Sequence, residues 1–205
     1  MPANDYFTDQ VYLDLRNRLG ADISNRVTDN PVGESVYDRL EIAPNAGVAS
    51  STTLQLSGFT ALVSQNITQV RVVTGTTAAA ATPTICRLGV YQRDQSTNLH
   101  TLVASTVNDT TLFAAASTTY TRPFSAAFNK VAGVDYLVGL LIVTGVALPT
   151  FVGPNASGNS AFGTDVQLAF PCVAGRVTGQ ADLPASFAGA SITTGSTPFH
   201  ALLLQ

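Results

Sequence analysis

Three side chains in this sequence could serve as the general base of a nucleophilic enzyme: His100, His200 and Lys130. Such chemistry needs a serine or cysteine beside the base and an acid that orients it. His100 follows a polar turn and His200 lies in the final apolar segment, and neither belongs to a catalytic motif. We therefore expect both histidines to pack or to lie at the surface, and we predict no enzyme and no catalytic residue.

Metal-ligating side chains are equally sparse. The two histidines and the two cysteines, Cys86 and Cys172, are too far apart to suggest a zinc set. Residues 94–98, Asp-Gln-Ser-Thr-Asn, resemble half of a calcium loop but lack the downstream glycine and glutamate that complete one. A tight hairpin turn needs the same residue types, and we favour that interpretation. We predict no metal and no cofactor.

Carboxylate pairs and exposed aromatic rings would point to sugar chemistry. The aspartates that could pair for glycoside hydrolysis are isolated in the sequence, so a cell-wall glycan hydrolase is only a third hypothesis. They are Asp94, Asp109, Asp135, Asp165 and Asp182. Phe151, Phe162 and Phe187 lie in segments rich in glycine and serine, where we expect long exposed loops, and are our candidates for surface recognition. The chain has no tryptophan, the usual sugar platform.

Charge divides the chain into two segments. Residues 1–41 hold twelve of its 23 charged side chains, whereas the remaining 164 residues are dominated by Thr, Ala, Val, Gly and Ser. The charged fraction of the whole chain is 11%, against an ordinary value of about 25%. Neither segment is basic enough to indicate nucleic-acid binding. A surface so poor in charge is suited to burial against neighbouring subunits.

The charged segment is predicted to be an N-terminal arm over residues 1–47. Phe7, Val11, Tyr12, Leu15 and Leu19 form one apolar stripe of a helix over residues 5–19, followed by turn and linker signals. A single helix of this length is marginally stable, so it must pack on its own body or dock on another subunit or protein. Under the second interpretation these residues anchor the protein to a larger particle.

Residues 48–205 are predicted to form an antiparallel β-sandwich, of jelly-roll type. Alternating apolar residues or short apolar runs predict strands that are separated by Gly, Pro, Asn and Ser turns. The expected strands cover residues 53–56, 67–72, 85–91, 99–105, 118–124, 134–144, 150–152, 165–170 and 199–204. The continuous apolar run at 134–144 indicates burial on both faces.

The sequence shows neither a signal peptide at its N-terminus nor an apolar run long enough to cross a membrane. We therefore expect synthesis and assembly in a cytoplasm, and no membrane partner. Buried free thiols are the commoner state for cysteines in such a chain, although a disulfide between Cys86 and Cys172 stays open.

About half of the chain, residues 54–152, resembles a domain of virion proteins from bacteriophages that infect actinobacteria, commonly minor tail proteins. The phrases that carry the resemblance are 54–61 (LQLSGFTA), 67–76 (ITQVRVVTGT), 81–91 (ATPTICRLGVY), 102–106 (LVAST), 108–115 (NDTTLFAA) and 131–139 (VAGVDYLVG). The resemblance implies a β-sandwich displayed on a virion, and it implies no catalytic residues.

The sequence and the resemblance together predict a non-enzymatic virion structural protein. A minor tail or tail-fibre-type protein that contributes to host-surface attachment is the first hypothesis. A capsid decoration protein anchored by the arm is the second, because tail-fibre relatives tend to be longer chains. The expected partners are further copies of the chain in a homotrimer, other tail or capsid proteins, and a host cell-surface glycan.

Overall fold

The computed structural model describes residues 33–35, 42–79, 83–145, 148–154, 174–194 and 199–205. These residues form a mainly β structure in which every strand pairing is antiparallel, and the one helical element is the 3-10 turn η3 (Gly189–Ser191). The strands are β1 (Gly33–Ser35), β2 (Ile42–Val48), β3 (Thr53–Thr60), β4 (Gln65–Val73), β5 (Ile85–Asp94), β6 (Leu99–Ser105), β7 (Thr119–Lys130), β8 (Asp135–Val143), β9 (Thr150–Pro154), β10 (Ala174–Val177), β11 (Ser186–Ala188), β12 (Thr193–Thr194) and β13 (Ala201–Leu204).

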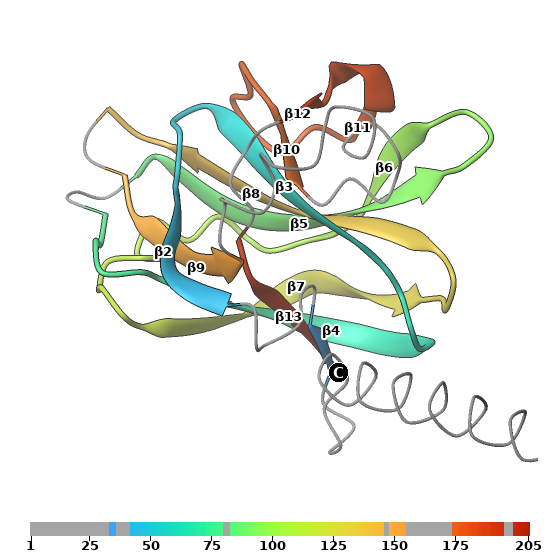
Figure 1. Cartoon of the computed structure of the whole chain (residues 1–205), viewed down its shortest axis with the longest axis horizontal. Coiled ribbons are helices and arrows are strands. Elements are labelled where there is room, and N and C mark those ends of the chain that lie inside the picture. Colours follow the sequence, from blue (N-terminus) through green and yellow to red (C-terminus); the bar gives the residue numbers. More distant parts are fainter. Residues whose placement is uncertain (1–32, 36–41, 80–82, 146–147, 155–173, 195–198) are drawn as a thin grey trace, which may run out of the picture.

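Two sheets lie one above the other, as in a β-sandwich (Figure 1). The larger sheet has the strand order β11-β6-β5-β8-β3-β10-β12, and the smaller has the order β1-β13-β4-β7. A separate ribbon of β2 and β9 lies at one side of the two layers (Figure 1). The predicted fold class, mainly β with antiparallel sheets, is confirmed.

The main core fills the space between the two sheets. On β4, Ile67, Val70 and Val72 are at most 1% exposed and belong to this core, whereas Asn66 and Arg71 face solvent. Leu88 and Val138 enter the same cluster from the larger sheet. This half-buried alternation is what the sequence pattern of these strands predicts.

A second apolar layer covers the outer face of the larger sheet. Leu54, Leu56, Leu137 and Leu141 point to this side, so β8 is buried on both faces, as its continuous apolar run predicts. The connection between β10 at one edge of this sheet and β11 at the other crosses these residues, and the cluster includes Val177 and Phe187 with partly buried Leu183 and Ile192. An apolar sheet face of this size needs such a cover, because exposed apolar patches are unfavourable in water.

Tyr91 packs beside two glycines on this outer face. Gly89 of β5 pairs with Gly139 of β8, so two neighbouring positions lack side chains. A Cβ at Gly139 would lie 2.8 Å from Leu54 Cδ1 and 3.0 Å from Tyr91 Cε2. A side chain at this position would therefore force Leu54 and the Tyr91 ring to shift, which glycine avoids.

Most predicted strands are confirmed, and the main differences are additional strands. The segments 53–56, 67–72, 85–91, 99–105, 118–124 and 134–144 fall in or closely match β3 to β8, while 150–152 lies in β9 and 199–204 contains β13. The strand predicted at 165–170 and the helix predicted at 5–19 lie outside the described residues. The jelly-roll strand order stays a prediction.

The additional strands lie in the predicted arm and in the predicted loops. β1 and all of β2 except Val48 fall inside residues 1–47, where the sequence predicts an arm and linker, and the two strands are paired with β13 and β9. β10, β11 and β12 fall in the segment expected to be a long exposed loop. Backbone pairing and the apolar outer face of the large sheet override local glycine and proline signals here.

Candidate functional site

The short strand β1 is held to the body by a buried ion pair between Glu34 and Lys130. Both side chains have 0% exposure, and Lys130 Nζ contacts Glu34 Oε2. Lys130 Nζ also donates to Val63 O at 2.6 Å, and Leu62 N donates to Glu34 Oε1 at 2.9 Å. The site therefore joins three separate parts of the chain: β1, the end of β7 and the turn between β3 and β4.

Gly33 and Ser35 complete this attachment, which we call the β1 clamp (Gly33, Glu34, Ser35, Lys130 and His200). A Cβ at Gly33 would lie 1.8 Å from Leu203 O, so only glycine fits against β13 at this position. Ser35 Oγ lies 2.6 Å from His200 Nε2. Because the side chains of neighbouring strand residues alternate between faces, Glu34 and Ser35 attach β1 from opposite sides.

The Ser35–His200 contact has the geometry of a nucleophile beside its base. Ser35 is 0% exposed, however, so its Oγ is not accessible to a substrate in this conformation. The contact instead connects β1 with the residue that precedes β13. Sequence reasoning identified His200 as a possible base but could not identify Ser35, which is 165 positions away.

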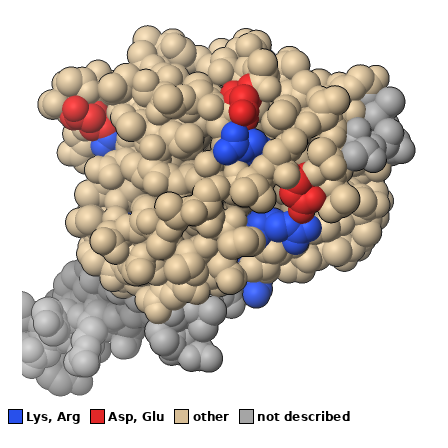
Figure 2. All heavy atoms as spheres, turned by 180° about the vertical axis from the view of Figure 1, so that it is seen from behind, with Lys and Arg blue, Asp and Glu red and all other residues tan. Residues whose placement is uncertain are grey.

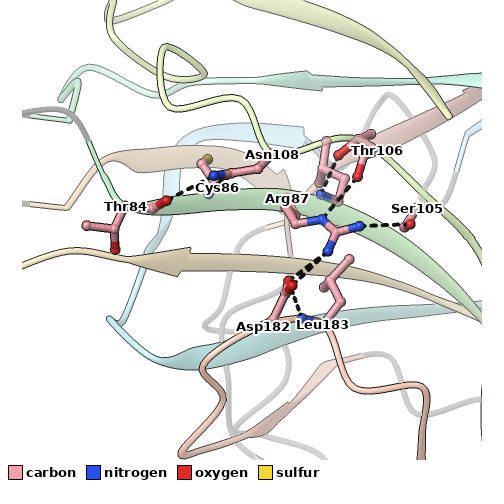
Figure 3. Close-up of polar contacts among 9 residues, drawn as sticks. Thr84, Cys86, Arg87, Ser105, Thr106, Asn108, Asp182 and Leu183 are labelled. Atoms are coloured by element: carbon pink, nitrogen blue, oxygen red, sulfur yellow. Dashed lines mark hydrogen bonds and ion pairs between the residues drawn. The ribbon is translucent and has the colours of Figure 1, made fainter. Parts of the chain in front are cut away.

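A second polar cluster fixes the cover of the outer core (Figure 3). Arg87 Nη1 donates to both carboxylate oxygens of Asp182, at 2.8 and 2.9 Å. Its other nitrogens donate to Thr106 O and Ser105 Oγ, each at 3.1 Å. Asp182 Oδ1 also accepts from Leu183 N at 2.7 Å. Since Arg87 lies on β5, the cluster attaches residues 174–194 to the middle of the larger sheet.

The described aspartates each bind a structural partner of their own. Asp109 Oδ2 accepts from Arg122 Nε at 2.6 Å, and Asp135 Oδ1 accepts from Thr60 Oγ1 at 2.7 Å while its Oδ2 pairs with Arg93. Figure 2 shows one face, on which most cationic and anionic side chains lie in a few small mixed groups and one cationic patch stands apart, while the rest of the described surface is uncharged.

Hydrogen bonds also lower the pKa of two of these aspartates. Ser96 and Thr97 donate to Asp94 Oδ1 and lower the pKa of Asp94 to about 2, as in an ordinary hairpin turn. Burial alone would raise the pKa of Asp109, but the bonds from Thr111 and Arg122 outweigh it and the pKa is lowered. Residues 94–98 thus form the turn between β5 and β6 that the sequence predicts.

Two of the three phenylalanines predicted for surface recognition lie in the core instead. Phe151 is 1% exposed, and its ring centroid lies 4.9 Å from that of Phe113. Phe187 is 8% exposed and lies 4.9 Å from Tyr91 and 5.1 Å from His100 between ring centroids. The apolar faces that they cover explain the difference from the expected exposed loops.

The remaining predicted site residues lie outside the described residues: Phe162, Cys172 and the arm residues Phe7, Val11, Tyr12, Leu15 and Leu19. Asp165 lies outside them as well.

Burial controls the chemistry of three ionisable groups. It raises the pKa of the free Cys86 thiol to about 12, helped by nearby Asp109, so this cysteine is a core residue rather than a nucleophile. Burial, with Arg93 nearby, lowers the pKa of His100 to about 4. It also raises the pKa of Tyr91, whose hydroxyl accepts or donates no hydrogen bond among the described residues.

Among the described residues, no three or more His, Cys, Asp and Glu side chains lie together in a group that could hold a metal ion. Within the same residues, no helix is long and apolar enough to span a bilayer. In comparisons with known proteins, the sequence matches no protein-family model, and no curated protein matches it significantly.

Proposed function

We propose that this chain is a non-enzymatic structural protein of a bacteriophage virion, with a β-sandwich body displayed on the particle. A minor tail or tail-fibre-type protein that contributes to host attachment is the function we favour. The observation that carries the proposal is the position, within the sheets, of the six sequence segments that resemble the phage virion domain. Five of the six lie on or run into β3, β4, β5, β6 and β8, and all of these except β4 are neighbours in the larger sheet.

The distribution of charge supports a protein that works among close neighbours. Arg87, Arg93, Arg122 and Lys130 are each paired with a carboxylate of the same chain. Surface patches that contact other subunits are depleted of unpaired charge, because removing a charge from water costs free energy. We infer that faces with few charges, such as that of Figure 2, contact further copies, in a homotrimer, or other virion proteins.

The β1 clamp supports an anchoring role for the N-terminal segment. We infer that the apolar stripe of Phe7, Val11, Tyr12, Leu15 and Leu19 binds the particle. The chain then enters the body through β1, where Glu34 and Ser35 are fully buried and bonded on both faces. A load applied to the arm therefore reaches the sandwich through side-chain bonds as well as through the short β1–β13 ladder.

Immunogold electron microscopy of whole virions tests the proposal directly. Label along the tail or at its tip is the expected result, and label on the capsid would select the decoration function in its place. Absence of the protein from purified particles would refute both. As a matched test of anchoring, a variant that lacks residues 1–32 should fold and stay out of particles, whereas a variant altered only at the 94–98 hairpin should be incorporated.

Host binding is tested separately with the purified protein. We expect it to bind host cells at micromolar concentration and to compete with infection. Binding that persists after removal of cell-surface glycan would contradict the proposed glycan partner.

A further inference from the structure

We propose that Lys130 and Glu34 condense to form an intramolecular amide that covalently joins β1 to β7. The site is a modification site within the β1 clamp, and the inference concerns the chain alone, whatever particle it belongs to. It arises from the arrangement of four groups: the amine, the carboxylate, one backbone N–H and one backbone carbonyl.

The contacts place the amine and the carboxylate for reaction with each other. Lys130 Nζ touches Glu34 Oε2, and Val63 O accepts one of its protons at 2.6 Å, which fixes the direction of the amine. Leu62 N donates to the other carboxylate oxygen, Oε1, at 2.9 Å. A backbone donor at this position stabilises the negative charge that develops on Oε1 when the amine attacks Cδ.

The reaction balances without an oxidant, a reductant or a second reactant. The ammonium of Lys130 first passes a proton to the carboxylate that it touches, which produces the neutral amine that attacks as a nucleophile. The Nζ–Cδ bond forms and the Cδ–Oε2 bond breaks. Two of the three ammonium protons leave with Oε2 as water, the third stays on the amide nitrogen, and Oε1 becomes the amide oxygen that accepts from Leu62.

Burial favours the amide over the ion pair and over hydrolysis back to the two separate side chains. Effective concentrations reach about 10⁵–10⁸ M for groups held in a near-attack geometry, so the fixed placement of the amine beside the carboxylate lowers the barrier to condensation. Both side chains are 0% exposed, so water is excluded and the reverse hydrolysis is hindered. An ion pair at this site must also overcome the desolvation of two charges, whereas the amide carries none.

Intact-mass spectrometry of the denatured full chain provides the test. We expect the bulk of the purified protein to be lighter than its sequence mass of 21.3 kDa by about 18 Da, the mass of one water. After trypsin, the peptide of residues 27–39 should be found joined to the fragment that contains Lys130. A purified, folded protein at the full sequence mass overturns the proposal.

The matched control is Lys130→Arg, which keeps a cation beside Glu34 but lacks a nucleophilic amine. This variant should have the full sequence mass and should migrate more slowly than the parent chain on a denaturing gel, because it lacks the internal link. A mass loss that persists in Lys130→Arg, or one that maps to other peptides, would also overturn the assignment. If the variant does not fold, the mass and peptide map of the parent chain still decide the question.

Discussion

Replacing Phe187 with alanine measures how much the cover of residues 174–194 contributes to stability. The ring is 8% exposed and packs against Tyr91 and His100, with centroid separations of 4.9 and 5.1 Å. Truncation of a buried phenylalanine to alanine costs about 3–5 kcal/mol. Phe187 lies on the three-residue edge strand β11, where the neighbours can relax. We therefore expect the free energy of unfolding to fall by about 3 kcal/mol, the lower end of this range.

The loss is large enough to be read from a thermal melt. For a chain of this size, about 1 kcal/mol corresponds to about 2–4 °C in Tm, so Phe187→Ala should melt about 6–12 °C below the parent protein. Urea unfolding gives a second measure of the same free energy. Both transitions are followed by circular dichroism, because the chain has no tryptophan to follow by fluorescence. The matched control is Val107→Ala, because Val107 is 62% exposed and should change the free energy of unfolding by less than about 0.5 kcal/mol.

The comparison of the two variants decides where Phe187 lies. Equal melting temperatures for Phe187→Ala and Val107→Ala would mean that the ring is not part of the outer core.

Four further changes test other parts of the structure. Tyr91→Phe should stabilise the fold by about 1 kcal/mol, because it removes a buried hydroxyl that has no described partner; a less stable variant would show that the hydroxyl is bonded. Arg87→Ala should cost about 1–3 kcal/mol in urea unfolding, against less than about 0.5 kcal/mol for exposed Arg71→Ala; similar losses would contradict the structural role of the Arg87 cluster. Gly33→Ala should cost about 2 kcal/mol or more and make the N-terminal segment sensitive to protease, because its Cβ would overlap Leu203 O. Because the folded-state pKa of His100 is lowered from 6.5 to about 4, its stabilising contribution is complete above pH 6.5 and is lost as the pH falls toward 4. The loss is at most about 3 kcal/mol, so His100→Gln should flatten the stability profile in this window, and an unchanged slope would argue against a buried neutral imidazole.

The local pattern of apolar residues was sufficient to predict the strands that line the main core. Alternation on β4 and the continuous apolar run of β8 each follow directly from which faces are buried. The polar residues at 94–98 likewise predict their own turn, because the hydrogen bonds of Asp94 are made within the same few residues.

Contacts between residues far apart in the sequence explain the features that the local pattern did not predict, namely strand β2 and the Glu34–Lys130 pair. β2 contains Pro44, Asn45 and Gly47, which are turn signals, yet it pairs with β9 through an irregular register between Ala43 and Gly47. Glu34 and Lys130 are 96 positions apart. One signal was available: Lys130 follows Phe128 on the same face of a strand, and a charge on an apolar face requires a buried partner.

Most cations of the described body, Arg71 and Arg176 excepted, are paired with a nearby carboxylate, which has a consequence for its sensitivity to ionic strength. Opposite charges a few ångströms apart cancel at a distance, so the body presents little long-range field to an approaching subunit. Its encounters with uncharged partners should then proceed at the unsteered rate of about 10⁵–10⁶ M⁻¹s⁻¹ and change little between dilute and concentrated salt. In a particle assembled through such faces, shape complementarity rather than charge attraction would hold the subunits in place, so the particle would stay assembled over a wide range of salt concentrations.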